Sequence, residues 1–326
     1  MCPIFVNFTE RIDTGRNRSV CGVTKLGNEI YVLCRSLFTP DQNVICVFEE
    51  RNSFRLRKKI KIREIICPFD IGSSEKETRL YVSDYGEENC VWKVILEANG
   101  KHEIMKWVNV VNQALTLSVC TDGRLLMVSS LSSMMMIYGS DAELCRSIQL
   151  PRDIKDPIHA VETSIGNFVV LHLWRRNEGR HSGTRVRKRG WLWVVSELTR
   201  DGEMVIRRFI PSNEVQKLNH PAYISIDPDD RVFVADNWNN RVILLDSDLK
   251  WNRILCPTID LSSNRIVSPA IEENRNRIQM PWRLYYDADR NQLIVGDFYS
   301  GEGVNVYTLS RTQIRFSSTH SGKHTS

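Results

Sequence analysis

The sequence predicts an all-β protein, a six-bladed β-propeller whose blades each hold three to four antiparallel strands. Three observations lead to this fold class. One short apolar phrase recurs six times, turn residues precede most copies, and no segment shows a sustained helical period of 3.6 residues. Radial repetition of small sheets is an arrangement that leaves few strand edges exposed.

Composition agrees with a folded chain and excludes several classes. The 326 residues are 42% hydrophobic and 25% charged, with only 17 Gly and 11 Pro, as in globular proteins. The longest apolar run, around Phe168–Trp174, is far short of the roughly 20 residues of a membrane-spanning helix. The first residues do not resemble a secretion signal. We therefore expect a soluble, cytoplasmic, monomeric protein that does not bind membranes.

The repeated phrase places the second strand of each predicted blade. Its copies lie 43 to 64 residues apart, at 30–33, 80–84, 125–128, 168–171, 232–236 and 293–297. An apolar strand about ten residues earlier, such as Ala222–Ile226, and another after it, such as Val242–Leu245, complete a blade. Five or seven blades, or a pair of β-sandwiches, are the alternatives, but sandwiches do not require one motif repeated at this period.

Ring closure is expected from the N-terminal segment. The first inner strand begins near Gly22, so Ile4–Thr9 is a spare strand that can complete the last blade beside Val304–Leu309. Residues 1–310 then form a single propeller, with 1–19 as the closing strand and lead-in. Residues 311–326 form a polar tail, expected to be disordered at its end.

Cysteine and charge patterns give weaker information. The nine cysteines include no C-x-x-C pair, so zinc-finger spacing is absent and reduced structural thiols are expected. The net charge of +5 is concentrated in residues 51–63 and 175–208. In 51–63, apolar and basic residues alternate, which predicts an outer strand with one wet face.

One repeat carries a complete family motif. Pro221 precedes an apolar strand, and Asp236, Asn239 and Arg241 follow the next one. These residues match the NHL-repeat pattern, and residues 20–310 resemble the divergent NHL propellers found alone or at the C-terminus of tripartite-motif proteins. The other five blades are degenerate. No RING or B-box array precedes the repeats, so the ubiquitin-ligase activity of that family is not expected. We expect Asp236, Asn239 and Arg241 to be structural.

A second set of residues occupies one equivalent position in all six blades. This position lies ten or eleven residues before the second residue of each phrase, where the innermost strand opens. Polar groups from different blades can converge there on one cavity, although the same residues could simply contact water at a channel mouth. The set is Cys21, Asp70, Thr116, His159, Tyr223 and Arg283.

The same position argues against catalysis. Calcium takes six to eight oxygen ligands, and Asp70 is the one carboxylate in this set. No G-x-S-x-G, H-E-x-x-H or glycine-rich phosphate loop is present. We therefore predict no catalytic, metal or cofactor site, and a metal-dependent hydrolase is a distant third hypothesis.

A basic insertion in blade four supplies the other candidate residues. It spans 175–190 and is flanked by tryptophans, so it combines phosphate attraction with aromatic stacking. The predicted function is a non-enzymatic scaffold that recognises a protein partner through one face, with single-stranded RNA as the alternative ligand. A solvated loop without a partner is the third interpretation. The residues predicted on this face are Asp70, His159, Tyr223, Arg283, Arg175, Arg176, Arg185, Arg187, Lys188, Arg189 and Trp238.

Overall fold

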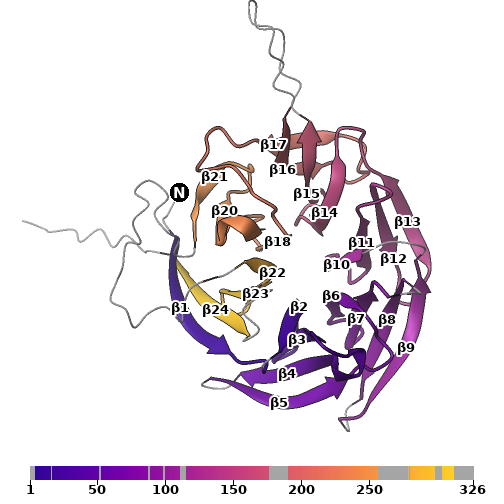
Figure 1. Cartoon of the computed structure of the whole chain (residues 1–326). Coiled ribbons are helices and arrows are strands. Elements are labelled where there is room, and N and C mark those ends of the chain that lie inside the picture. The colour runs from indigo at the N-terminus through magenta and orange to yellow at the C-terminus, as the bar shows by residue number, and fades with distance from the viewer. Residues whose placement is uncertain are drawn as a thin grey trace, which may run out of the picture.

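The chain forms a closed ring of six blades (Figure 1). The computed structural model describes residues 4–15, 17–50, 53–86, 89–97, 100–110, 115–175, 190–255, 278, 280–297 and 303–311. Within these ranges every blade is a sheet of four antiparallel strands. The predicted all-β, six-bladed propeller is confirmed.

In the first three blades, strand order along the chain is strand order from the centre of the ring outward. Blade one holds β2 (Arg18–Leu26), β3 (Glu29–Ser36), β4 (Val44–Glu50) and β5 (Phe54–Lys61), with the 3₁₀ turn η1 (Pro40–Gln42). Blade two holds β6 (Pro68–Ser74), β7 (Arg79–Asp84), β8 (Cys90–Leu96) and β9 (His102–Asn109). Blade three holds β10 (Leu115–Val119), β11 (Leu125–Ser129), β12 (Met134–Tyr138) and β13 (Leu144–Gln149).

Blades four and five repeat this order, and blade six modifies it. Blade four holds β14 (Lys155–Glu162), β15 (Phe168–Arg175), β16 (Trp191–Leu198) and β17 (Val205–Phe209). Blade five holds β18 (Tyr223–Ile226), β19 (Val232–Asp236), η2 (Asn237–Asn239), β20 (Arg241–Leu245) and β21 (Trp251–Ile254). Blade six holds β22 (Pro281–Asp287), β23 (Gln292–Asp297), β24 (Val304–Arg311) and, outermost, β1 (Ile4–Ile12).

The N-terminal strand closes the ring. β1 runs antiparallel to β24, with Ile4 opposite Arg311 and Ile12 opposite Val304 (Figure 1). The two ends of the propeller therefore share one sheet, and the outer edge of β24 is covered. The C-terminal segment 312–326 lies outside the described residues.

The core lies between neighbouring blades. Leu33 and Val47 of blade one pack with Ile71 and Val82 of blade two in one buried cluster, and similar clusters fill other seams. Near the centre the inner strands approach so closely that one position requires glycine. A Cβ at Gly22 would lie 2.6 Å from Ile71 Cγ2 and 2.8 Å from the Ile71 amide nitrogen.

Surface features of the described chain follow the sequence pattern in part. The basic run is the outermost strand β5, in which Phe54 and Ile60 are buried while most basic neighbours are not. The only helices in the described ranges are two 3₁₀ turns of three residues, and neither could span a membrane. The seven cysteines placed by the structure are all free thiols.

Candidate functional site: an aromatic pocket above a buried polar network

The equivalent position in the six inner strands converges on the centre of the ring. All six residues there are nearly inaccessible, with exposed fractions between 0% for Asp70 and 6% for Tyr223. Four of them, Asp70, His159, Tyr223 and Arg283, interact with one another and with the backbone of Leu117. We call this group the central network.

Arg283 and Asp70 form the charged part of the network. Arg283 Nε donates to Asp70 Oδ1 at 3.1 Å, and both side chains are at most 1% exposed. Asp70 also accepts the backbone N–H groups of Ile71 and Leu117, each at 2.9 Å. Burial raises the pKa of Asp70, while Arg283 and the two amides oppose that rise. A buried pair of this kind requires both partners, because either charge alone would be uncompensated.

The Arg283 guanidinium is also enclosed by carbonyls and rings. Its Nη2 donates to Phe69 O at 2.7 Å, and its Nη1 donates to Trp282 O at 3.0 Å. Its central carbon lies 5.0–5.1 Å from the ring centroids of Phe69, Tyr223 and Trp282. These contacts orient the planar cation and stabilise it without a second carboxylate.

His159 and Tyr223 form the uncharged part. Their rings stack at 3.6 Å between centroids, and both contact one acceptor, the Leu117 carbonyl. Tyr223 donates to it at 2.9 Å, and His159 Nε2 lies 3.2 Å from it. Burial lowers the pKa of His159 to about 3, so the imidazole is neutral at pH 7 and Nε2 carries the proton that it donates. Neither group is accessible for proton exchange with a bound molecule.

A pocket opens beside this network, on the face where the innermost strands begin. Its volume is about 260 Å³, and its lining comes from blades two to six. We call it the mouth pocket. It is lined by Phe69, Thr116, Val128, Ser130, Pro157, Ile158, Trp193, His220, Pro221, Ala222, Asn237, Trp238, Trp282 and Arg283.

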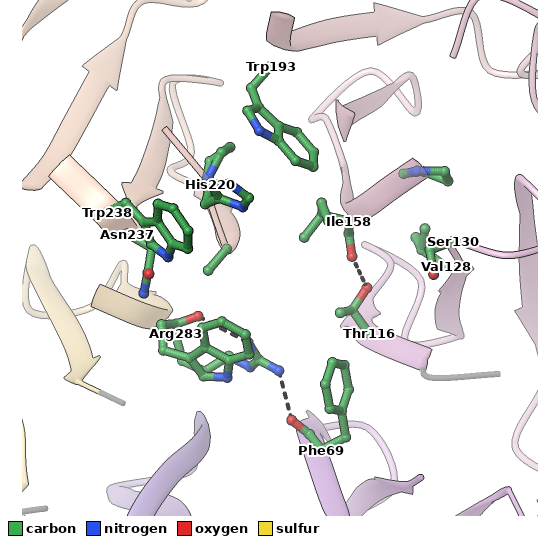
Figure 2. A pocket seen from close by; sticks show the side chains of 14 residues that line it. Phe69, Thr116, Val128, Ser130, Ile158, Trp193, His220, Asn237, Trp238 and Arg283 are labelled. Atoms are coloured by element: carbon green, nitrogen blue, oxygen red, sulfur yellow. Dashed lines mark hydrogen bonds between the residues drawn. The ribbon is translucent and has the colours of Figure 1, made fainter. Parts of the chain in front are cut away.

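Aromatic rings dominate this lining. In Figure 2, Trp193, His220 and Trp238 lie on one side of the pocket, Thr116 and Ile158 lie across from them, and Arg283 lies near Phe69. The His220 and Trp238 rings stack at 3.8 Å between centroids, and Trp193 lies 6.2 Å from His220. Trp238 is 56% exposed, although it is a large apolar ring. The pocket thus offers flat apolar surfaces to solvent.

The backbone at the opening is strained in a repeated way. His220 has a φ of 45° and precedes Pro221, and Asp156 and Met280 adopt the same left-handed conformation before Pro157 and Pro281. For residues other than glycine, such a conformation costs about 1–3 kcal/mol of conformational free energy, and it tends to occur at functional sites. At His220 this conformation accompanies the stack of the imidazole on Trp238.

Phe69 and Trp282 reach the pocket because of β-bulges. The pairing register shifts between Pro68 and Asp70 in β6, and between Pro281 and Arg283 in β22. The extra residue in each bulge is the aromatic one. A bulge re-aims its side chains, so both Phe69 and Asp70 can serve the same centre although strict alternation would separate them.

The other predicted residues have different positions. Trp238 lines the mouth pocket, whereas Arg175 is exposed outside it, 6.0 Å from the Trp191 ring centroid. The predicted loop residues Arg176, Arg185, Arg187, Lys188 and Arg189 lie outside the described residues. Sequence reasoning did not identify Phe69, His220 or Trp282 as site residues. The only signal was their place in the sequence. Phe69 and Trp282 directly precede the predicted residues Asp70 and Arg283, and His220 directly precedes Pro221.

The family-motif residues form a bracket in blade five. Asp236 Oδ2 accepts Arg241 Nε at 2.6 Å and Asn239 Nδ2 at 2.8 Å, and both charged side chains are at most 1% exposed. Asp236 Oδ1 accepts the Asn219 N–H at 2.7 Å, and Arg241 Nη2 donates to Lys217 O at 3.0 Å. Burial raises the pKa of Asp236, an effect that these hydrogen bonds and Arg241 oppose. The bracket fixes the segment that carries His220 and Pro221.

Metal binding finds no support in the described ranges, where no three His, Cys, Asp or Glu side chains group as ligands. The mouth pocket has no carboxylate in its lining.

Comparison with known proteins identifies the fold. No family model and no curated protein matches the chain. Among solved structures, a hydrazine synthase chain from Kuenenia stuttgartiensis is 13% identical, with coverage of 94% of this chain and 98% of that one and a TM-score of 0.58. Virginiamycin B lyase from Staphylococcus aureus is 10% identical, with coverage of 94% and 99% and a TM-score of 0.55. An inactive variant of that lyase, solved with quinupristin, is 9% identical, with coverage of 94% and 99% and a TM-score of 0.56.

These likenesses correct the predicted function. The non-enzymatic scaffold for a protein partner, with single-stranded RNA as its alternative, is contradicted, because propellers that match nearly the whole chain include lyases. The inference from fold to partner recognition was therefore wrong. At identities of 13% or less, the likenesses show a shared six-bladed propeller fold and do not transfer an activity.

Proposed function

We propose that this propeller binds a small molecule in the mouth pocket. One observation carries the proposal: five aromatic rings from four blades surround a cavity of about 260 Å³ and remain partly accessible to solvent. Exposed rings around a concavity with a few polar groups are typical of ligand sites. The volume is close to the lower end of the usual range for such sites, roughly 300–1,000 Å³. It suits a molecule of one or two rings.

The central network supports this proposal because it gives the pocket a rigid base. The inner strands of blades two to six are joined there by hydrogen bonds of 2.7–3.2 Å. A base fixed in this way holds Phe69, Trp282 and Arg283 in place before a ligand arrives, and such preorganisation reduces the entropy lost on binding. A structural neighbour solved with quinupristin shows that another propeller of this fold takes a small molecule.

The test is a fragment screen on the purified chain with two matched tryptophan variants. Trp238→Ala removes a ring that lines the pocket. Trp191→Ala removes a ring that is almost equally exposed, 54% against 56%, but lies outside the lining. Stacking on an aromatic side chain contributes about 1–3 kcal/mol, so Trp238→Ala should weaken hits at least fivefold by calorimetry. Trp191→Ala should leave their affinity unchanged. Hits that are insensitive to both Trp238→Ala and Trp193→Ala would contradict the proposal.

We also infer that the chain is a divergent NHL-type propeller of the cytoplasm. The bracket of Asp236, Asn239 and Arg241 supports the first part, because the motif residues work together as one hydrogen-bonded unit. The free thiols of the described cysteines support the second part, since disulfides are rare in the cytosol. Imaging a tagged full-length chain in its host cell would test the location.

A further inference from the structure

We propose that the mouth pocket selects flat aromatic molecules that carry an anionic oxygen, with an aromatic carboxylate as the simplest example. This inference rests on the proposed function, because it names the class of ligand for the same site. Three properties of the lining lead to it: its charge, its hydrogen-bond donors and its shape.

The charge of the pocket lining argues against a quaternary ammonium group, the common ligand of an aromatic cage. Rings around a cavity commonly bind quaternary ammonium groups through their faces. In this pocket, Arg283 already lies 5.0–5.1 Å from the ring centroids of Phe69 and Trp282, and no Asp or Glu lines the cavity. Asp70 balances Arg283 from within the network, but it does not line the pocket. A cationic ligand in the pocket would lie near the Arg283 guanidinium and would find no carboxylate in the lining to pair with.

The Arg283 guanidinium retains donors for an acceptor. Arginine has five N–H groups, and three of them bond to Asp70, Trp282 and Phe69 within the described chain. The other two N–H groups, one on each terminal nitrogen, have no hydrogen bond within the described chain, and Arg283 belongs to the pocket lining. A carboxylate can accept two N–H groups from one guanidinium, which makes it a better match than a single carbonyl. Charge and donor geometry therefore favour the same group.

Shape favours a flat ring system. The stacked pair of His220 and Trp238 bounds one side of the pocket, and Ile158 bounds the other (Figure 2). A ring inserted between them would stack on an aromatic face and contact an aliphatic side chain, while its acidic group points to Arg283. A saturated ring of equal size would fill the volume but would lose the stacking interaction.

The decisive experiment compares matched probes on the unmodified chain. Calorimetry would measure 2-naphthoate, 2-naphthamide and 2-naphthyltrimethylammonium, which share one ring system and differ in charge. We expect 2-naphthoate to bind at least tenfold more tightly than the ammonium probe, with the amide between them. Decahydro-2-naphthoate, a saturated two-ring carboxylate of the same carbon number, tests whether charge and size are enough, and it should bind at least tenfold more weakly than 2-naphthoate.

Each alternative result has a distinct meaning. If the ammonium probe binds as tightly as the carboxylate, the ligand class is wrong while the pocket stands. If decahydro-2-naphthoate binds as tightly as 2-naphthoate, the aromatic part of the proposed ligand class is wrong. If none of the probes binds while fragment hits still depend on Trp238, the class fails and the proposed function survives. If no fragment depends on Trp238, the proposed function itself fails.

The variant Arg283→Lys, with Trp191→Ala as its control, tests whether the Arg283 guanidinium causes the preference for a carboxylate. Arg283→Lys keeps the positive charge but loses the planar fork, and we expect it to weaken 2-naphthoate at least fivefold with little change for 2-naphthamide. Because Arg283 belongs to the central network, circular dichroism and urea unfolding must first show a folded variant. Should it not fold, the comparison of probes on the unmodified chain still decides the proposal. Trp191→Ala serves as the control, since it leaves the pocket lining intact.

Discussion

His159 in β14 and His172 in β15 lie in neighbouring strands of blade four and are almost fully buried, with exposed fractions of 1% and 0%. Burial is the main cause that lowers their pKa values, to about 3 for His159 and about 4 for His172. His172 is held by Leu173 O and Ser196 Oγ, each at 2.8 Å from a ring nitrogen. Both imidazoles are neutral in the folded protein at pH values where the unfolded chain would already bind protons.

This difference predicts a loss of stability in mild acid. The unfolded chain protonates each histidine below about pH 6.5, whereas the folded chain does so only near pH 3 to 4. Stability is therefore complete above pH 6.5 and falls as the pH is lowered toward 4. Between pH 7 and pH 5 the loss is about 2 kcal/mol for each histidine. Asp70, whose pKa is raised, acts in the opposite direction and offsets part of it at lower pH.

Urea unfolding at pH 7, 6 and 5 measures this effect. His159→Phe keeps the ring stack on Tyr223 but cannot titrate, so between pH 7 and pH 5 its stability should fall by about 2 kcal/mol less than that of the unmodified chain. The exposed His102 provides the control for replacing an imidazole by a phenyl ring, through the variant His102→Phe. An unchanged pH dependence in His159→Phe would show that burial of this imidazole is not the cause.

At the scale of the strand, close approach between blades makes a glycine necessary. Gly22 in β2 faces Ile71 in β6, where an added Cβ would meet backbone as well as side-chain atoms at less than 3 Å. Backbone atoms of a central strand cannot move aside without disturbing both blades. Gly22→Ala should therefore reduce the free energy of unfolding by about 1–3 kcal/mol. Gly190→Ala is the matched control, because among the described residues no atom beyond its chain neighbours lies within 4 Å of its added Cβ. Equal urea midpoints for the two variants would contradict this account.

The strands also show which site residues could be predicted from the sequence and which could not. The periodic phrase located the second strand of every blade, and counting back from it located Asp70, His159, Tyr223 and Arg283 at the centre. Counting could not locate Phe69 and Trp282, because bulges shift the register at these points. Each bulge lies at the first residues of its strand, where too few residues precede it for a change of alternation to be recognised in the sequence. The burial of Arg283 and Asp70 could not be predicted either, since nothing in one sequence shows that these two residues, 213 positions apart, form a pair.

At the scale of the whole molecule, the repeat explains why the fold was predictable while the function was not. Each blade buries its faces against two neighbours, so one apolar phrase repeated six times is enough to specify the ring. The function depends instead on a few side chains at the centre of one face, and these differ from blade to blade. Solved propellers that are 8–10% identical and match 94% of this chain show that the fold persists when most of the sequence differs.

Ring closure gives the last prediction, because β1 is the one strand that joins the two ends of the chain in a sheet. Ile12 is 2% exposed and packs in a cluster with Val304 and Val306, and Phe8 contacts the Tyr307 ring edge-on at 5.7 Å. Lys25 of blade one adds a buried link at the same seam, with Asp287 Oδ1 at 2.6 Å. Deleting residues 1–12 would remove the pairing with β24 and expose the edge of that strand, while the link from Lys25 to Asp287 would stay.

We expect the truncated chain to unfold at a clearly lower urea concentration and to associate through the exposed edge of β24. A synthetic peptide of residues 1–15, added in trans, should restore the midpoint in a concentration-dependent way, because it binds the folded ring and not the unfolded chain. A scrambled peptide of the same composition should not. If the truncated chain unfolds at the same urea concentration as the full chain, β1 does not hold the propeller closed, and stability resides in the seams between blades alone.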